Sequence, residues 1–385
     1  MPMDALGAGA LAVCLLAVAW TGATILAALA RPRRRRHPGG CSSRPPVSVV
    51  VPVSSPAPGL PACVASLARL DYPEYEVVLC AASGDRTAVR AVEVMQQQHP
   101  AIRTCVVAPA TLDNPKSGLL AVAVREARHD LLLLTDDNVV SAATRIQDHL
   151  AHKDAGHGLV SAAALGDSSE NFWAAVDEAF MNGRFARLQL AGDAIGLTFT
   201  TGKSILVSRA ALDASGGYAA AGRTLCEDAI VQQALAAMGV RAALSDAPVR
   251  QPLGRRTLAE VWHRHLRWAG CRKRHVPLLF AAELLVSAPV AAITGGIASA
   301  SLGPGFAVGA AGTTAVLMAM EGAFLVLAGW PLDRRFAIAW LVREALSLAL
   351  WFAVLVPRRR VVWRDQTFVA GARDQPNSRA SKRTD

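Results

Sequence analysis

The chain has 385 residues, 52% of them hydrophobic, and a formal net charge of +10. Its mean hydropathy of +0.30 is too high for a soluble protein of this length, so part of the chain is expected to lie in lipid. Lys and Arg cluster beside apolar segments and form no stripe interleaved with aromatic residues, which excludes a nucleic-acid-binding protein and indicates a membrane surface.

The N-terminal segment predicts a transmembrane helix over residues 1–30. Ala5 to Ala30 is almost entirely apolar, and the basic run Arg31 to Arg36 follows at once. A signal peptide instead has a shorter apolar core with its positive charge in front. Because basic flanks stay on the cytoplasmic side, we expect the N-terminus outside and a basic linker, residues 31–46, in the cytoplasm.

Residues 47–275 predict one cytosolic α/β domain. Short β-branched runs predict strands at Val47–Val53, Glu76–Cys80, Ile102–Val107 and Asp130–Leu134, and amphipathic stretches between them predict helices at Leu60–Leu70, Arg86–Gln98 and Ser117–Arg128. This alternation is typical of a parallel sheet. Ligands are expected at the C-terminal ends of its strands.

Two acidic pairs are candidates for chemistry. Asp136 and Asp137 directly follow the apolar run of the fourth predicted strand, where they either hold a divalent metal ion beside a nucleotide-sugar diphosphate or cap a helix. Glu227 and Asp228 precede a helix predicted from Ala229. They either stabilise its N-terminus, or Asp228 is the base that removes a proton from an acceptor hydroxyl.

A third element is Arg264-x-x-Arg267-Trp268, on a helix predicted from Leu258 to Gly270. At this spacing both Arg side chains lie on one face, where they can clamp a diphosphate while Trp268 offers a platform for a sugar ring or an acyl chain. The alternative is a basic interfacial helix with a Trp anchor. His263 and His265 flank Arg264, but residues two apart face different directions and are not expected to share a metal ion.

Residues 276–356 are almost continuously apolar and predict membrane segments at roughly 277–301, 306–330 and 336–356. If all three cross the bilayer, the basic cluster Arg358 to Arg360 ends outside, against the charge rule. We therefore expect 336–356 to be interfacial or re-entrant. This segment carries Arg343 and Glu344, a pair that is costly in lipid unless the two satisfy each other or lie near an interface. Residues 357–385 are expected to form a basic, partly disordered tail.

The seven cysteines are an odd number without any C-x-x-C spacing, and Cys63, Cys80 and Cys105 lie in apolar stretches. This pattern favours thiols buried as small hydrophobic side chains in a reducing compartment. It does not favour zinc ligands.

Taken together, these residues resemble the ceramide glucosyltransferase-like family of membrane-bound glycosyltransferases, family 21, which is similar to family 2. The resemblance spans most of the chain and rests on Asn114-Pro115-Lys116, Asp136, Leu165-Gly166-Asp167, Thr201-Gly202, Glu227-Asp228, Arg264-x-x-Arg267-Trp268, Trp340 to Glu344 and Trp363-Arg364. It implies a GT-A (Rossmann-like) catalytic domain held by an N-terminal transmembrane helix and C-terminal membrane helices.

The resemblance also implies an activity: an inverting, UDP-sugar-dependent hexosyltransferase that makes a glycolipid from a lipid acceptor such as ceramide or diacylglycerol. The expected location is the bacterial inner membrane, because the abundance of Ala indicates a G+C-rich bacterial genome, with a multi-pass chain and its catalytic domain in the cytoplasm. A divalent ion, Mg or Mn, is the implied cofactor. One alternative is a processive polysaccharide synthase of the family 2 type, for which the predicted membrane part is small. The other is an inactive membrane scaffold whose GT-A domain has decayed.

Roles carry over residue by residue. Asp136 matches the first motif aspartate of the family and is expected to bind the metal ion together with Asp137. Asp167 matches the second motif aspartate. Asp228 matches the third and is the expected base. Arg264, Arg267 and Trp268 match the fourth motif, and Lys116, Gly202 and Glu227 are expected to contact the donor. The chain departs from the family pattern at two points. It has Asp136-Asp137-Asn138 where many members have Asp-x-Asp, and after the second predicted strand only Asp85 is a candidate for the acid that holds the uracil or ribose.

Overall fold

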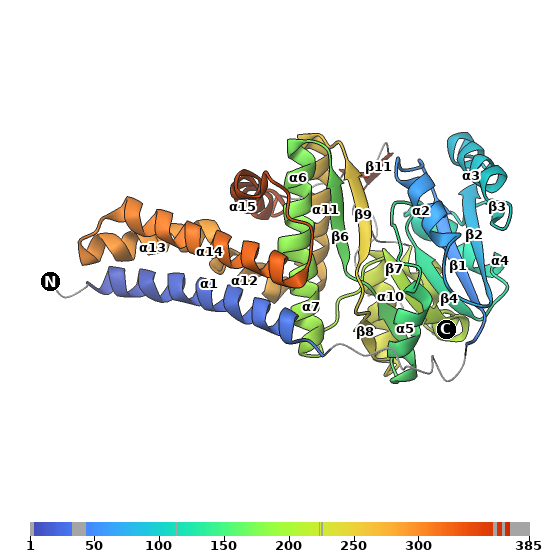
Figure 1. Cartoon of the computed structure of the whole chain (residues 1–385), viewed down its shortest axis with the longest axis horizontal. Helices are drawn as coiled ribbons and strands as arrows, with labels where there is room; N and C mark the ends of the chain where they lie inside the picture. Colours follow the sequence, from blue (N-terminus) through green and yellow to red (C-terminus); the bar gives the residue numbers. More distant parts are fainter. Residues whose placement is uncertain are drawn as a thin grey trace, which may run out of the picture.

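The computed structural model describes residues 4–32, 44–112, 114–222, 224, 226–356, 360–363 and 366–369. Figure 1 shows an α/β part at one end and a bundle of long helices at the other, joined by a layer of helices. The predicted linker, 31–46, and tail, 357–385, lie mostly outside the described residues. Two short antiparallel strands, β10 (Arg360–Trp363) and β11 (Gln366–Val369), fall within the predicted tail.

The described residues contain a central seven-stranded sheet in the order β3-β2-β1-β4-β7-β5-β8. Its strands are β1 (Val47–Val53), β2 (Tyr75–Ala82), β3 (Arg103–Val107), β4 (Leu131–Thr135), β5 (Leu159–Ser161), β7 (Ser204–Ser208) and β8 (Ala242–Leu244). Strands β1 to β4 are parallel, whereas β7 runs antiparallel to β4 and β5. The predicted α/β class and the four predicted strands are confirmed. The reversal at β7 was not predicted.

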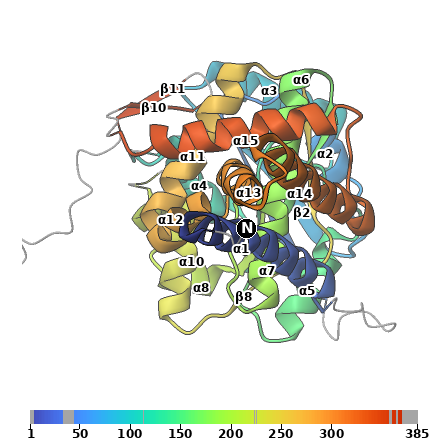
Figure 2. The same ribbon diagram turned by 90° about the vertical axis from the view of Figure 1, so that its left-hand side faces the viewer.

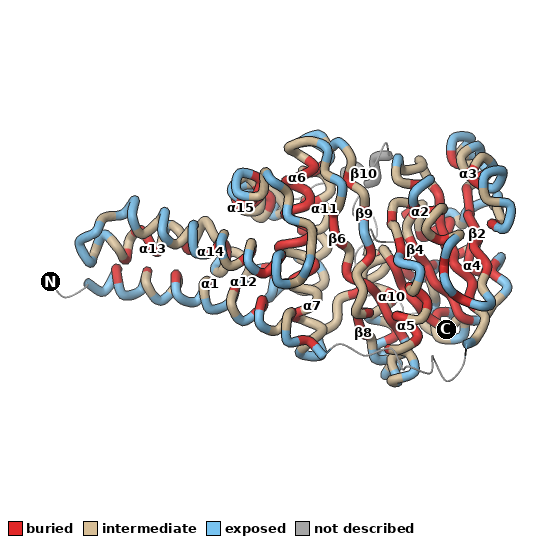
Figure 3. Tube along the Cα trace, viewed as in Figure 1, coloured by how far each residue is buried: buried red, intermediate tan, exposed pale blue. Residues whose placement is uncertain are grey.

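Helices cover both faces of this sheet because successive strand residues point to opposite sides. Val49 and Val51 of β1 pack with α2 (Leu60–Leu67), α3 (Arg86–Gln98) and α5 (Arg145–Asp154), whereas Val50 packs on the other face. That face is covered by α4 (Pro115–Glu126), α8 (Arg209–Ala214), α9 (Gly217–Ala221) and α10 (Glu227–Ala237). In Figure 3 the buried residues concentrate in this region.

A layer of helices lies between the sheet and the long helices (Figure 1). It contains α6 (Phe172–Ala179), the π-helical segment η1 (Phe180–Ala186), α7 (Arg187–Ala194) and α11 (Leu258–His275). A second, two-stranded sheet of β6 (Ala164–Ser169) and β9 (Val249–Gly254) packs beside them. Helix α11 starts at a capping box formed by Thr257 and Glu260, which fixes where the Arg-x-x-Arg-Trp segment begins.

Four helical stretches of the described chain are long and apolar enough to cross a membrane. They are α1 (Ala5–Ala30), α12 with α13 (Pro277–Leu285 and Ala288–Leu302), α14 (Phe306–Ala328) and α15 (Phe336–Ala353). Helices α1, α13 and α14 lie side by side, and their surfaces are largely exposed or half-buried (Figures 1 and 3).

Helix α15 runs across the other long helices instead of along them (Figures 1 and 2), and it packs mainly on α6 and α11. Arg343 of α15 donates to Glu344 and to Glu321 of α14, so this ionisable pair is satisfied by contacts within the protein. The prediction that 336–356 does not cross the bilayer agrees with this course and stays a prediction.

Candidate functional site

A cavity of about 1030 Å³ reaches from the C-terminal end of β4 to the long helices. Most of the residues singled out from the sequence line it: Lys116, Asp136, Asp137, Gly202, Glu227, Asp228, Arg264, Arg267 and Trp268. Its far wall is formed by side chains of the apolar helices, including Trp20, Leu317 and Trp340. One continuous space therefore joins the charged cluster to the membrane part.

Lys116 lies at the centre of the charged cluster. Its Nζ is 2.9 Å from Oδ1 of Asp136 and 3.0 Å from Oε1 of Glu227. Asn114 caps α4 by accepting from the backbone N–H of Lys116, and its Nδ2 donates to Glu227 at 2.9 Å. Burial acts to lower the pKa of Lys116, but Asp136, Glu227 and Asp228 raise it above its usual range. Lys116 therefore stays charged.

Asp228 has the properties of a general base. Burial raises the pKa of this carboxyl to about 7; Glu227 and Asp136 act in the same direction, against Lys116. Its Oδ1 is buried and has no hydrogen-bond partner among the described residues. A carboxyl that titrates near neutral pH, with an unsatisfied oxygen in a cavity, is suited to take a proton from a hydroxyl group.

Gly202 precedes β7 and approaches this base closely. A Cβ at this position would lie 2.5 Å from Oδ2 of Asp228 and 2.7 Å from Nζ of Lys116. Any larger residue would displace these two side chains. The glycine is thus required by the arrangement of the cluster.

Asp136 lies between two lysines, of which the sequence analysis singled out only Lys116. Lys203 places its Nζ 2.8 Å from Oδ2 of Asp136 and 3.1 Å from Oδ1 of Asn138. Burial acts to raise the pKa of Asp136, but the two lysines hold it well below its usual range. Asp137 is only 2% exposed, and its Oδ2 accepts from the backbone N–H of Ala57 at 3.3 Å.

The two predicted metal carboxylates, Asp136 and Asp137, therefore have different neighbours. No group of three or more His, Cys, Asp or Glu residues able to hold a metal ion occurs in the described part of the chain.

The Arg-x-x-Arg-Trp segment is held by Asp177 of α6, which the sequence analysis did not find. Asp177 is 1% exposed and accepts from Arg264 at 2.9 Å and from Nε2 of His265 at 2.8 Å. Burial acts to raise the pKa of Asp177, but Arg264 and His265 lower it to about 2. His265 is itself buried, and the expectation that the two histidines do not form a metal pair agrees with this contact.

Trp268 packs against one aromatic side chain of the π-helical segment and against His265. Its ring lies edge-on to Phe185, with centroids 5.2 Å apart, and the guanidinium of Arg264 is 5.7 Å from the indole centroid. Arg264 is thus oriented both by a buried carboxylate and by an aromatic face. Arg267 lines the same cavity.

Asp85 and Asp167 lie elsewhere. Asp85 caps α3 and accepts from the backbone N–H of Ser55 at 3.1 Å, so it holds a loop whose residues line the cavity. Asp167 is on β6 and pairs with Arg250 at 2.8 Å. Neither is among the described residues that line the cavity, and their predicted donor contacts stay predictions.

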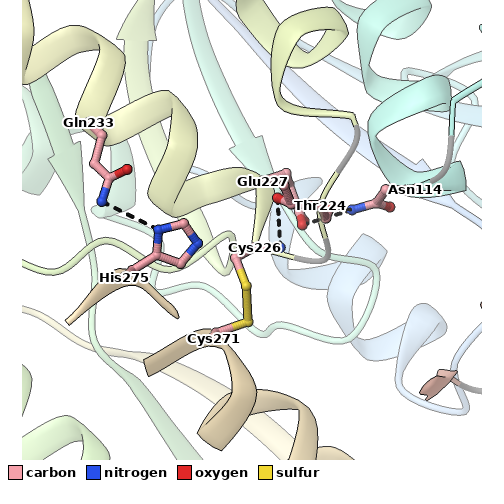
Figure 4. The surroundings of a disulfide bond; sticks show 7 residues. All are labelled: Asn114, Thr224, Cys226, Glu227, Gln233, Cys271 and His275. Atoms are coloured by element: carbon pink, nitrogen blue, oxygen red, sulfur yellow. Dashed lines mark hydrogen bonds between the residues drawn. A yellow bond between two sulfur atoms is a disulfide. The ribbon is translucent and has the colours of Figure 1, made fainter. Parts of the chain in front are cut away.

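Cys226 and Cys271 form a disulfide (Figure 4). It joins the residue before Glu227 to α11, so it connects the base-bearing segment with the helix of Arg267 and Trp268. The prediction of reduced thiols is wrong for this pair, because the fold brings together two cysteines 45 residues apart. Cys14, Cys63 and Cys80 are free and buried as expected and Cys105 is half-buried, while Cys41 lies outside the described residues.

Removing this disulfide is expected to destabilise the protein. Replacing Cys226 and Cys271 with serine frees the 45-residue segment in the unfolded chain, at a cost of about 2–4 kcal/mol. The melting temperature in detergent should fall, and a reductant should lower it in the parent protein but not in the double variant. Cys105→Ser is the matched control. A parent melting temperature unaffected by reductant would contradict this.

Comparisons with known proteins give the family of the chain and its fold. The sequence profile described as glycosyl transferase family 21 matches residues 9–374. Ceramide glucosyltransferase 1 of Caenorhabditis elegans is 29% identical over 251 residues, covering 63% of this chain and 53% of that protein. Ceramide glucosyltransferase 3 of the same organism is 28% identical over 253 residues, covering 63% and 54%. The chain thus spans about half the length of these curated relatives.

Among solved structures, the chain resembles the mannosyltransferase PcManGT of Pyrobaculum calidifontis, solved in complex with GDP-Man and Mn²⁺. The TM-score is 0.54 at 20% identity, over 90% of this chain and 98% of that one. At this identity the likeness shows the fold alone, and that fold is the expected GT-A arrangement.

Proposed function

Because the chain belongs to glycosyl transferase family 21, we propose that it is a membrane-bound, inverting glycosyltransferase that moves a hexose from a UDP-sugar to a hydroxyl group of a membrane lipid. The observation that supports this best is the single cavity that joins Asp228 to the apolar helices. A water-soluble donor and a lipid acceptor can meet there. The sugar and the lipid, ceramide or diacylglycerol among others, are part of the proposal.

The donor side of the cavity carries cationic side chains suited to a diphosphate. Lys116, Lys203, Arg264 and Arg267 line it. Guanidinium and ammonium groups stabilise phosphate oxygens by charge-assisted hydrogen bonds. The solved relative in fold holds GDP-Man, and the choice of a UDP-sugar for this chain is our proposal.

The proposed reaction is one direct displacement. Asp228 takes the proton of the acceptor hydroxyl while that oxygen forms a bond to the anomeric carbon on the face opposite the leaving group. The bond from the anomeric carbon to the diphosphate breaks, and its electron pair remains on the phosphate oxygen. Lys116 and the arginines stabilise the developing charge. The configuration of the sugar is inverted, with no covalent intermediate.

The predicted Mg or Mn ion stays a prediction, and the donor set as arranged does not fit it. Both carboxylate oxygens of Asp136 already receive ammonium groups, and Asp137 accepts from a backbone amide. A bound divalent ion would supply positive charge to the diphosphate. No step above is routed through one.

On the acceptor side, Arg187 is a buried cation without a full set of partners among the described residues. Arg187 of α7 is 7% exposed and lines the cavity, and its Nε and one terminal nitrogen have no hydrogen-bond partner among the described residues. Leaving such donors unpaired is costly. A lipid head group with hydrogen-bond acceptors would satisfy them, while Trp20 and Leu317 contact its chains.

We also propose the placement in the membrane: α1, α13 and α14 cross the bacterial inner membrane, α15 lies along its surface, and the sheet is in the cytoplasm. The crosswise course of α15 supports this (Figure 2). Arg31 directly follows α1, and the last turn of α11 carries Arg272, Lys273 and Arg274; the cytoplasmic leaflet attracts such basic residues.

Lipid mass spectrometry tests the proposed reaction. Lipids extracted from cells that express the protein should contain a species heavier by one hexose or a related sugar unit than a lipid of cells lacking it. The mass difference identifies the sugar, and fragmentation identifies the lipid. Cells expressing Asp228→Asn are the control. Identical lipid profiles, or a long sugar polymer as the product, would contradict the proposal.

A further inference from the structure

Lys203 occupies the position where a chelating pair would hold a cation. Its Nζ lies 2.8 Å from Oδ2 of Asp136 and 3.1 Å from Oδ1 of Asn138, so these two oxygens converge on one ammonium group. The side chain is 14% exposed and starts beside Gly202, at the base of the cavity. Asn138 is the residue that stands where Asp-x-Asp has its second carboxylate.

The charges at this point match a monovalent cation. Asp136 contributes one negative charge and the amide of Asn138 none, whereas two carboxylates would balance a divalent ion. Lys116 already binds the other oxygen of Asp136 at 2.9 Å. A divalent ion at this point would have to displace the ammonium of Lys203. The displaced ammonium would then lack its contact with Asp136, in a cavity that also contains the cations Lys116 and Arg264. Like charges that lose their counter-charge in a buried site are unfavourable.

We propose that the ammonium of Lys203 is the resident cation of this site: it holds Asp136 and Asn138 in place of a divalent ion and gives the donor diphosphate a fixed positive charge. Nucleotide binding by this chain then needs no metal. This inference rests on the proposed function for its nucleotide part only. The claim that Lys203 excludes a metal ion stands on the geometry of Asp136 and Asn138.

Metal binding without nucleotide tests the exclusion. Purified full-length protein is titrated with Mn²⁺, and free Mn²⁺ is followed by electron paramagnetic resonance. The parent protein is expected to bind weakly, and Lys203→Met at least about tenfold more tightly, because the variant exposes two oxygens and removes a like charge. Lys153→Met, on α5 outside the cavity lining, should behave as the parent. Equal affinity of the parent and Lys203→Met would overturn the inference.

A second variant guards against a folding defect of the first. Asn138→Asp keeps Lys203 and adds the missing carboxylate, so Mn²⁺ binding should strengthen relative to the parent here too. Melting temperatures of all variants show whether each is folded. If Asn138→Asp is folded and binds Mn²⁺ no better than the parent, Asp136 and residue 138 are not a latent cation site and the inference fails.

Calorimetry with UDP tests the consequence for the donor. In EDTA the parent is expected to bind UDP within about twofold of its affinity in Mn²⁺, whereas Lys203→Met should lose about tenfold in EDTA and recover part of it in Mn²⁺. UDP binding by the parent that disappears in EDTA would overturn the inference while supporting the proposed function. No UDP binding in either condition would count against the proposed donor, and the Mn²⁺ titration would still decide the role of Lys203.

Discussion

Replacing Asp228 with asparagine is expected to lower kcat by about 10²- to 10⁴-fold and to leave the Kd for UDP nearly unchanged. The amide has almost the same shape as the carboxylate but cannot accept the proton of the acceptor hydroxyl. The cations that face the diphosphate stay in place. Turnover with a labelled UDP-sugar and calorimetry with UDP measure the two quantities, and Asp154→Asn on the exposed end of α5 is the matched control.

The pH profile checks the same assignment. The pKa of Asp228 is raised to about 7, chiefly by burial, and only its deprotonated form can act as base. The kcat/KM should therefore rise with pH and level off above about 7, falling about tenfold for each unit below that value. In Asp228→Asn this acidic limb should be absent from the residual activity. A limb that persists in the variant, or turnover retained at the parent level, would assign the base to another residue.

Replacing Asp177 with asparagine is expected to destabilise the protein by about 3–5 kcal/mol. Asp177 is 1% exposed and is the carboxylate partner of both Arg264 and His265, so its loss leaves the Arg264 guanidinium without that counter-charge. The melting temperature in detergent measures the effect, again with Asp154→Asn as control. Activity should fall with it, because Arg264 and Trp268 lose the contact that orients them.

A double variant separates lost pairing from a general packing defect. Adding Arg264→Met to Asp177→Asn removes the unpaired charge, so the double variant should be more stable than Asp177→Asn. If the losses of stability caused by the two single substitutions simply add in the double variant, Asp177 does not act through Arg264. If the Asp177→Asn protein is as stable as the parent, this buried contact does not stabilise the fold.

The sequence allowed the parallel core and much of the charged cluster to be predicted for physical reasons. The strands β1 and β4 are buried along their whole length and consist mostly of apolar residues, a pattern typical of a parallel sheet covered on both faces. Asp136 directly follows β4, and Asp228 lies in the first turn of α10. The role of Lys116 came instead from the family resemblance, since its position alone, after Asn114 and Pro115 at a helix start, does not distinguish it from a solvated residue.

Other features depend on contacts between distant segments, which no local pattern reveals. Lys203 follows Thr201 and Gly202, a sequence that resembles an ordinary turn, and its role depends on Asp136, 67 residues earlier. Asp177 sits in an amphipathic helix beside other buried residues, so nothing local distinguishes it from a satisfied core acid. The pairing of Cys226 with Cys271 likewise cannot be deduced from spacing.

Two of the predicted site acids also make backbone contacts that the local sequence does not reveal. Asp137 follows Asp136 directly, but adjacent residues at a strand end point in different directions, and the carboxylate of Asp137 binds the amide of Ala57. Asp85 caps the N-terminus of α3, as acidic residues before a helix commonly do. Neither of these two backbone contacts can be predicted from composition or motif spacing.

The central claim is that the Asp228 carboxylate and the cations around it act on a sugar donor in a cavity open to the membrane helices. Purified protein in lipid nanodiscs, supplied with radiolabelled UDP-hexoses, tests it directly. We predict that label passes into the organic phase with the parent protein and that this transfer is lost with Asp228→Asn. Label that remains entirely in water-soluble products, or equal transfer by the variant, would contradict the account.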